Sequence, residues 1–254
     1  MIKKAIIFGD VHGKFNAWAN YIKRKVDIYD DLYNAPIFQL GDFGIWAQTL
    51  EDGAHGLKKI CNNHQIYFLR GNHEEYTRKG KSFFSDYNKV IIPKWFSDFK
   101  HVPIFMEGYK EFNDILTLWV GGAFSVDYRE RREGKTWWSI EELPDRELIK
   151  KHIQIDKTPK MIMTHDAPET FVNRYMGKYV NEVCAPDGTK KTGSSELNIL
   201  YNAYQPVWWF FGHYHMDFYK IDERTGTKFF CFPTFNNGFG IYNFETNDLT
   251  FNFK

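Results

Sequence analysis

Short apolar runs, each followed closely by glycine, aspartate, asparagine or histidine, constrain the fold of this chain more than any other feature. Each run has the length and the β-branched or aromatic content of a buried strand. The runs are Ala5–Phe8, Ile37–Leu40, Gln65–Leu69, Thr117–Val120, Met161–Thr164 and Val207–Phe211. Helical stretches between several of them, such as Asn16–Val26, make the pattern typical of an α/β protein with a layered sheet.

The remaining elements are predicted from a helix cap and from turns. Ser139 followed three residues later by Glu142 is a capping-box pattern, which predicts a helix over Ser139–Ile153. The C-terminal part is typical of an antiparallel meander, with short strands at Phe218–Ile221, Lys228–Phe232, Gly240–Phe244 and Leu249–Phe253. Two packed sheets flanked by helices accommodate both halves. Because the chain contains no repeat or linker, we expect one domain over residues 1–254.

Composition excludes several other classes of protein. Hydrophobic residues make up 43% and charged residues 26% of the chain, which excludes a disordered protein. The formal net charge of +1 gives no overall field that would attract nucleic acid or an anionic membrane. The sequence has neither a signal-peptide core nor the roughly 20 apolar residues of a membrane span. The three cysteines have no CxxC spacing, which suits a reducing compartment. From these features together we expect a cytoplasmic protein without membrane contact.

Polar residues gather directly after the predicted strands, in the segments Asp10–Gly13, Gly41–Asp42, Gly71–Glu74, Thr164–Asp166 and Gly212–His215. Ligands of open α/β sheets bind at the carboxyl ends of the strands, and alternate residues of an extended segment point the same way. Carboxylates, a carboxamide and imidazoles at one edge form a ligand set for divalent Mn, Zn or Fe. Two neighbouring metals need a shared ligand, and Asp42 is the candidate for a bridging carboxylate.

These five segments resemble, in the same order, the motifs of the calcineurin-like metallophosphoesterase superfamily: DxH, GDx, GNHE, TH and GHxH. The resemblance extends from Asp10 to His215, about four-fifths of the chain. It implies a four-layer α-β-β-α sandwich, in which two mixed β-sheets pack together and helices cover both outer faces. It also implies hydrolysis of phosphate esters by water that two divalent metal ions activate. Manganese is the expected metal, and Fe, Zn, Ni, Co or Mg are the alternatives.

The resemblance implies a role for each motif residue. Asp10, His12 and His215 would bind the first metal, Asn72, His165 and His213 would bind the second, and Asp42 would bridge the two. His73 would contact the substrate phosphate and protonate the leaving group instead of binding a metal. A positively charged imidazole at that place would also stabilise charge on the phosphoryl oxygens.

Candidate substrate contacts follow from a departure from one branch of the superfamily. Its protein serine/threonine phosphatases carry a second Asp and a phosphate-binding Arg shortly after the GD motif, where this chain has Phe43–Trp46. Arg offers bidentate donors for phosphate, and Trp offers a face for a ring. We predict Arg129 or Arg132 as the replacement and Trp137 as a ring contact, in a loop that resembles one in uncharacterised bacterial and phage members; a solvated loop is the alternative. Arg70, directly before GNHE, is a further candidate that could equally pack or pair locally.

Three functions stay open on the sequence. A phosphatase would act on a phosphorylated small molecule, a nucleotide or a phosphopeptide. A phosphodiesterase would act on a cyclic nucleotide, a dinucleotide or a nucleic acid, although the near-neutral charge argues against binding long nucleic acid. A non-catalytic metal-bound scaffold is the third alternative, which the presence of His73 and of every predicted ligand disfavours.

Other residues receive a structural interpretation. We expect four histidines to be structural and two tryptophans to lie in the core: His55, His64, His101, His152, Trp208 and Trp209. The segment 171–195 has no clear periodicity and is interpreted as an insertion between the TH and GHxH motifs. It either shapes specificity or is a surface loop without a role.

Overall fold

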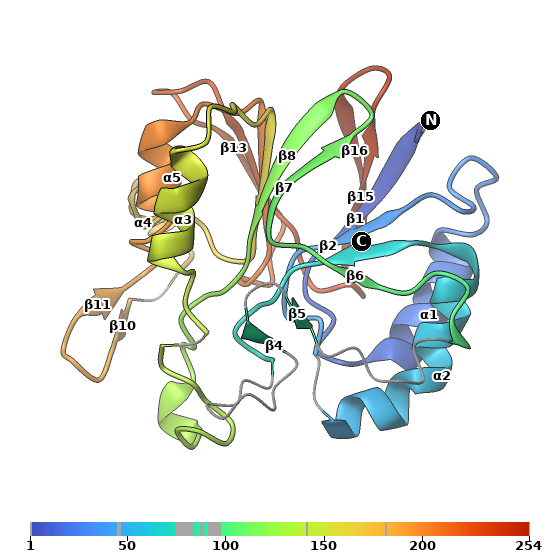
Figure 1. Cartoon of the computed structure of the whole chain (residues 1–254), viewed down its shortest axis with the longest axis horizontal. Coiled ribbons are helices and arrows are strands. Elements are labelled where there is room, and N and C mark those ends of the chain that lie inside the picture. Colours follow the sequence, from blue (N-terminus) through green and yellow to red (C-terminus); the bar gives the residue numbers. More distant parts are fainter. Residues whose placement is uncertain are drawn as a thin grey trace.

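The structure is a computed structural model that describes residues 2–44, 47–74, 84–86, 89–90, 98–140, 142–180 and 182–253. Two six-stranded mixed sheets pack together, and helices flank their outer faces (Figure 1). The predicted α-β-β-α sandwich of two mixed sheets with flanking helices is confirmed. None of the helices in these residues is long and apolar enough to cross a membrane.

The first sheet has parallel strands at its centre and an antiparallel pair at one edge. In spatial order its strands are β16 (Asp248–Phe253), β15 (Gly238–Asn243), β1 (Lys4–Phe8), β2 (Ile37–Gln39), β3 (Ile66–Phe68) and β6 (Ile104–Phe105). Strands β1, β2, β3 and β6 are parallel, whereas β15 is antiparallel to both β1 and β16. The helices α1 (Phe15–Lys25) and α2 (Ala47–Asn63) make the crossovers that parallel neighbours require.

The second sheet has the same mixed character. In spatial order its strands are β13 (Phe218–Ile221), β14 (Lys228–Cys231), β12 (Trp208–Phe211), β9 (Met161–Thr164), β8 (Ile115–Val120) and β7 (Gly108–Phe112). Strands β14, β12, β9 and β8 are parallel. The helices α3 (Arg146–Ile153), α4 (Glu169–Phe171) and α5 (Asn198–Ala203) connect them.

Shorter elements lie outside the two main sheets. A 3₁₀ turn spans Tyr128–Glu130, and a π-helical turn spans Val172–Met176. Two small antiparallel hairpins are formed by β4 (Phe84–Asp86) with β5 (Lys89–Val90) and by β10 (Val183–Cys184) with β11 (Lys190–Lys191).

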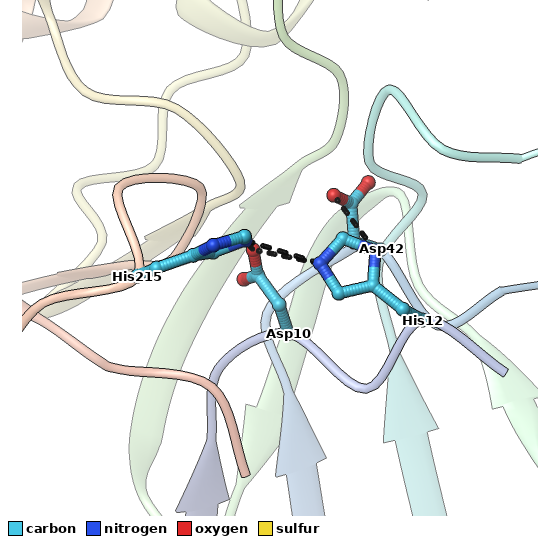
Figure 2. Close-up of side chains that lie close together, drawn as sticks. All are labelled: Asp10, His12, Asp42 and His215. Atoms are coloured by element: carbon cyan, nitrogen blue, oxygen red, sulfur yellow. Dashed lines mark hydrogen bonds and ion pairs between the residues drawn. The ribbon is translucent and has the colours of Figure 1, made fainter. Parts of the chain in front are cut away.

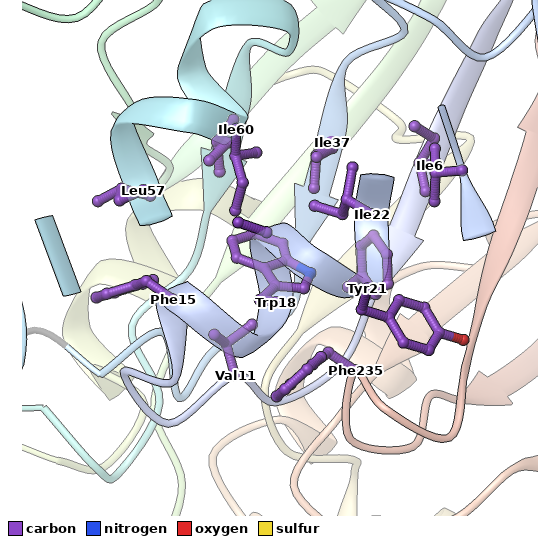
Figure 3. Close-up of a cluster of buried hydrophobic side chains, with 14 of the residues drawn as sticks. Ile6, Val11, Phe15, Trp18, Tyr21, Ile22, Ile37, Leu57, Ile60 and Phe235 are labelled. Carbon is purple, nitrogen blue, oxygen red and sulfur yellow. The ribbon is translucent and has the colours of Figure 1, made fainter. Parts of the chain in front are cut away.

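Alternation of side chains along the strands explains why both faces of each sheet are buried. Ile6 of β1 lies with Trp18 of α1 in one outer layer (Figure 3), and Phe8 packs against Trp18 in the same layer, whereas Ala5 and Ile7 pack between the sheets. The near-continuous apolar runs predicted from the sequence are therefore strands that are covered on both sides.

Strand β12 repeats this alternation in the second sheet. Trp208 packs between the sheets, whereas Trp209 belongs to the other outer layer, with its ring 5.2 Å from that of Phe229. The prediction that both tryptophans lie in the core is confirmed. His64 is also structural, since it is buried with one ring nitrogen 2.7 Å from the Ala35 carbonyl and the other 2.9 Å from Asp27.

The predicted capping box is wrong. The helix begins at Arg146, and the Asp145 carboxylate caps it by accepting hydrogen bonds from the backbone N–H groups of Glu147 (2.9 Å) and Leu148 (3.1 Å). Pro144 disfavours helical backbone at the preceding residue, so the helix cannot extend back to Ser139. Glu142 is buried instead and has the different role described below.

The predicted C-terminal meander is also wrong, although its four strands exist. The β13–β14 hairpin joins the second sheet, because β14 pairs in parallel with β12. The β15–β16 hairpin joins the first sheet, because β15 pairs with β1. The chain crosses between the sheets after β14, so Phe232 and Tyr242 fill the same layer between the sheets from opposite sides. Local turns predict each hairpin, but not the sheet that it joins.

Candidate metal centre and active site

Four predicted ligands from three loops converge at the carboxyl ends of β1, β2 and β12. The ligand atoms of Asp10, His12, Asp42 and His215 all lie within 4.8 Å of one another, and Figure 2 shows their side chains gathered there. The Nε2 atoms of His12 and His215 are 3.0 Å apart, and His215 Nε2 lies 2.8 Å from Oδ2 of Asp10. Nitrogen and oxygen donors that approach one another this closely suit a shared divalent cation.

The backbone of these loops bends sharply at the ligands themselves. His12, Asp42, His213 and His215 have positive φ angles of 52°, 49°, 69° and 55°. Left-handed backbone is unfavourable for residues with a Cβ atom and persists where the surrounding structure imposes it, often at functional sites. Gly41 has a φ of +91°, and a Cβ atom there would lie 2.3 Å from Nδ1 of His165. A glycine is therefore required for that imidazole to reach the centre.

The three ligands predicted for a second metal form an adjoining group. His165 Nε2 lies 3.1 Å from Oδ1 of Asn72 and 3.3 Å from Oδ1 of Asp42. The Nδ1–H of His165 donates to the Leu40 carbonyl at 2.7 Å, which leaves Nε2 with its lone pair toward the centre. The ring of His213 stands 5.1 Å from that of His165, and the His213 backbone N–H donates to Asp10 at 3.0 Å.

Asp42 lies between the two groups, as a bridging ligand would. Its Oδ1 faces His165, while its Oδ2 lies 3.7 Å from Nδ1 of His12. The carboxylate is 1% exposed, and Asp10 is fully buried. Two buried carboxylates side by side are costly unless positive charge accompanies them.

The pKa shifts of the centre describe the same charge balance. Burial raises the pKa of Asp42, but the neighbouring imidazoles of His165 and His73 outweigh burial and hold it well below its usual value. Burial lowers the pKa of His165, but the charge and hydrogen bond of Asp42 together with the charge of Asp10 outweigh burial and raise it to about 10. Burial and the nearby His165 lower the pKa of His213 to about 3. A divalent ion held by these ligands would supply the two positive charges that balance both carboxylates.

Glu74, the last residue of the GNHE motif, has a positional role that the sequence did not reveal. It is fully buried, and its two carboxylate oxygens accept hydrogen bonds from the backbone N–H groups of Gly44 (3.1 Å) and Gly71 (2.6 Å). One side chain therefore ties the loop that carries Asp42 to the loop that carries Asn72.

Ser125 and Glu142 orient Asn72, and neither was predicted as part of the site. The Asn72 side-chain amide donates to Ser125 Oγ at 3.1 Å, which turns its carbonyl oxygen toward His165. The Ser125 hydroxyl and backbone N–H both donate to Glu142 at 2.8 Å, and the Trp137 indole donates to the same carboxylate at 2.9 Å. Such partners fix the orientation of metal ligands. From the sequence, only the neighbouring candidates Arg129, Arg132 and Trp137 pointed to this loop.

We expect Glu142→Gln to weaken Mn²⁺ binding by roughly 10- to 100-fold, because glutamine has one acceptor oxygen in place of two and cannot keep both Ser125 bonds that hold the Asn72 amide. Titration of the metal-stripped protein with Mn²⁺ in the presence of a competing chelator measures this change. Glu133→Gln is the matched control, since Glu133 accepts hydrogen bonds from Ser139 at the exposed surface of the same loop. Equal affinities of both variants and the wild type would contradict the role of Glu142.

His73 lies beside the bridging carboxylate and contacts an arginine. Its backbone N–H donates to Asp42 Oδ1 at 2.8 Å, and its side chain is 35% exposed. Arg131 Nη2 lies 2.8 Å from Nδ1 and 2.5 Å from Nε2 of the His73 ring. The same nitrogen pairs with Asp127 at 2.7 Å, so Asp127 holds the guanidinium in place. Burial lowers the pKa of His73, with a further lowering from the Arg131 charge.

The four predicted substrate contacts lie elsewhere. Arg70 is buried and donates to the Leu143 carbonyl at 2.8 Å. Trp137 is buried and bound to Glu142. Arg129 is exposed and donates to the Tyr128 hydroxyl at 3.2 Å, and Arg132 is exposed. None of the four lines the cavity at the metal centre, whereas Arg131 between Arg129 and Arg132 reaches His73.

The buried pair of Arg70 and Glu107 predicts a pH dependence of stability. Burial raises the pKa of Glu107 to about 7, although Arg70, 3.8 Å away, opposes the shift. A carboxyl group with a folded-state pKa above its unfolded value stabilises the fold below about pH 4.5 and loses that contribution as the pH rises through 7. Between pH 5 and pH 8 we therefore expect the free energy of unfolding of the wild type to fall by up to roughly 3 kcal/mol on account of Glu107, and Glu107→Gln should remove this fall. Urea unfolding of both proteins at each pH measures the difference. Glu111→Gln, on the exposed face of β7, is the control and should keep the pH dependence of the wild type.

A cavity of about 640 Å³ opens over the centre. Among its lining residues are six of the motif side chains: His12, Asp42, Asn72, His73, His213 and His215. Residues of the loop after β8 and of the segment 179–193, which belongs to the predicted insertion, also line it. The volume is within the range of pockets that bind drug-sized ligands.

A two-sheet α-β-β-α sandwich with an Asp/His cluster at the ends of its parallel strands defines a class of metal-dependent hydrolases. The calcineurin-like phosphoesterase family model matches residues 3–217, and the chain belongs to that family. Members of the family bind divalent metal ions. No protein with a curated function matches the sequence of this chain significantly.

Solved structures share the fold at low sequence identity. The protein TT1561 of Thermus thermophilus is 11% identical, with a TM-score of 0.56 over 100% of this chain and 99% of that chain. A phosphopantetheinyl hydrolase of Mycobacterium tuberculosis is 11% identical, with a TM-score of 0.52 over 93% and 92% of the two chains. The sulfate thiohydrolase SoxB of Thermus thermophilus is 8% identical, with a TM-score of 0.51 over 98% and 56%. These likenesses establish the fold alone.

Proposed function

We propose that this protein is a phosphatase that hydrolyses phosphate esters of small molecules at a centre of two divalent metal ions. The observation that carries the proposal is the pair of buried carboxylates, Asp10 and Asp42, surrounded by imidazoles whose nitrogens face the same point. We also propose a reducing, cytoplasmic location, which suits the three free cysteines.

The ligands divide between the two ions by their positions. We assign Asp10, His12 and His215 to the first ion, Asn72, His165 and His213 to the second, and Asp42 to both. When bound, two such ions supply an activated water and positive charge for the phosphoryl oxygens. Imidazole and carboxylate donors suit Mn²⁺, the expected ion, and Fe²⁺, Zn²⁺, Ni²⁺, Co²⁺ or Mg²⁺ would meet the same ligands.

His73 is the proposed general acid. It lines the cavity beside Asp42, and its backbone N–H bond to that carboxylate fixes its position relative to both ions. The ring is exposed enough to reach an ester oxygen, and its protonated form, which the lowered pKa of His73 confines to lower pH than usual, can transfer a proton to the departing alcohol.

Arg131 is the proposed positioning residue for His73, a role different from the phosphate contact predicted for Arg129 or Arg132. Its guanidinium is held by Asp127 and lies against the imidazole, with a further contact of 3.4 Å to the Asn72 carbonyl. Because its side chain is only 8% exposed, the charge acts on His73 with little screening by water.

We expect Arg131→Ala to lower kcat/KM roughly 10²-fold, because His73 loses the contact that orients it. Removal of the adjacent positive charge also raises the pKa of His73, so the alkaline limb of the pH–rate profile moves to higher pH. The controls are Arg129→Ala and Arg132→Ala. Both should keep the kcat/KM and the pH–rate profile of the wild type. A loss of activity without any shift of the profile would contradict the contact with His73.

Phosphodiesterase activity is the second candidate. The cavity of about 640 Å³ is large enough to hold both ester groups of a phosphodiester, and this observation supports the second candidate. A metal-bound scaffold is disfavoured, because His73 lines the cavity with the ligands.

Hydrolysis of p-nitrophenyl phosphate and bis-p-nitrophenyl phosphate by the metal-stripped protein, with and without Mn²⁺, tests the proposal. We expect Mn²⁺-dependent turnover with a preference for the monoester. A preference for the diester would favour the phosphodiesterase, and no turnover despite two bound metals would favour the scaffold.

A further inference from the structure

One face of the β10–β11 hairpin forms a wall of the cavity. Val183 and Lys191 are opposite each other in the hairpin, and both line the cavity. Cys184 and Lys190, the neighbouring pair, are exposed and do not line it. This difference follows from the alternation of side chains along each strand.

Hydrogen bonds from both sides fix this wall relative to the metal centre. The Tyr128 hydroxyl donates to the Cys184 carbonyl at 2.8 Å, which ties the hairpin to the loop after β8. The hydroxyl of Tyr214, between two proposed ligands, lies 3.1 Å from the Thr192 carbonyl and 2.6 Å from Oδ1 of Asp166, so it is shared between these two acceptors. The wall is therefore a built part of the site and not an unattached surface loop.

The wall combines apolar side chains with one cation. Val126 and Tyr179 are 56% and 64% exposed although they line a cavity, and Val183 and Met216 continue the apolar surface. Lys191 is half-buried; no salt bridge is defined for it within the described part of the chain, and its charge contributes only to lowering the pKa of the exposed Asp187 in the hairpin turn. Lys190, by contrast, pairs with Glu182 at 2.8 Å outside the cavity. Exposed apolar groups in a cavity mark a surface for ligand contact, and a cation beside them suits an anionic group.

We propose that the natural substrate is a phosphate ester whose alcohol part carries an aromatic or other apolar group and a second anionic group. The apolar group lies against Val126, Tyr179 and Val183, and the anionic group pairs with Lys191. This inference rests on the proposed function, because the metal centre in the same cavity must hold the scissile phosphate.

Calorimetric binding of phosphonates to the Mn²⁺-loaded protein tests the inference without depending on turnover. The probes are methylphosphonate, benzylphosphonate and para-carboxybenzylphosphonate. We expect the ring to lower Kd about tenfold and the added carboxylate to lower it about fivefold further. Val183→Asn should remove most of the benefit of the ring, and Lys191→Met should remove only the benefit of the carboxylate.

Cys184→Asn and Lys190→Met on the outer face of the same hairpin are the matched controls, and we expect both to bind all three probes as the wild type does. Equal Kd values for the three probes in the wild type would overturn the inference, and so would equal losses in the inner and outer variants. If the probes bind as expected but Mn²⁺-dependent ester hydrolysis is absent, the proposed function fails while the binding surface stands. If hydrolysis occurs without discrimination among the probes, only the inference fails.

Discussion

His73→Ala is expected to lower kcat for p-nitrophenyl phosphate roughly 10²- to 10⁴-fold in the presence of Mn²⁺. The imidazole is the proposed proton donor, whereas the contact with Asp42 comes from the backbone N–H, which alanine keeps. We therefore expect the variant to retain two metal ions per chain. Steady-state kinetics and metal analysis of the same sample measure both quantities.

His55→Ala is the control for this variant, because His55 is exposed on α2 and does not line the cavity. Its kinetic constants should equal those of the wild type. Loss of a metal ion from the His73 variant would assign the imidazole to the ligand set instead, and unchanged kcat would remove it from the mechanism.

Asp42→Asn is expected to have the second large effect, a loss of both metal binding and activity. The substitution keeps the shape of the side chain but removes the charge that lies between the two ligand groups. If the ions supply several kcal/mol of transition-state stabilisation, turnover falls by roughly 10³-fold or more. Since a metal stabilises the fold that binds it, the rise in Tm that Mn²⁺ gives the wild type should also disappear.

Differential scanning calorimetry with and without Mn²⁺, together with the turnover assay, measures these effects. Asp114→Asn at the surface should leave both the Tm rise and turnover unchanged. A full Tm rise in Asp42→Asn would show that the metals do not need this carboxylate, and the bridging role would be wrong.

The layers of the fold can be predicted from the sequence because strands that are buried on both faces consist of continuous apolar runs. The runs Ala5–Phe8 and Met161–Thr164 are examples, and the structure has β1 and β9 at these positions. The placement of the β13–β14 hairpin in one sheet and the β15–β16 hairpin in the other depends on contacts between residues far apart in the chain. Turn residues cannot predict such contacts.

The ligands are predictable because each stands in a short motif after a strand. Arg131 is not predictable in this way, since three arginines lie within four residues and only the path of the 3₁₀ turn decides which one faces His73. Glu142 has the spacing of a capping box with Ser139, and only the tertiary structure shows that it binds Ser125. The role of the segment 171–195 depends on the hairpin register, which aperiodic sequence does not predict.

The most direct test of the dinuclear centre is anomalous X-ray diffraction from crystals of the Mn²⁺-loaded protein. We expect two peaks, one among Asp10, His12 and His215 and one among Asn72, His165 and His213, with Asp42 beside both. A single peak, or peaks away from these side chains, would contradict the two-metal account.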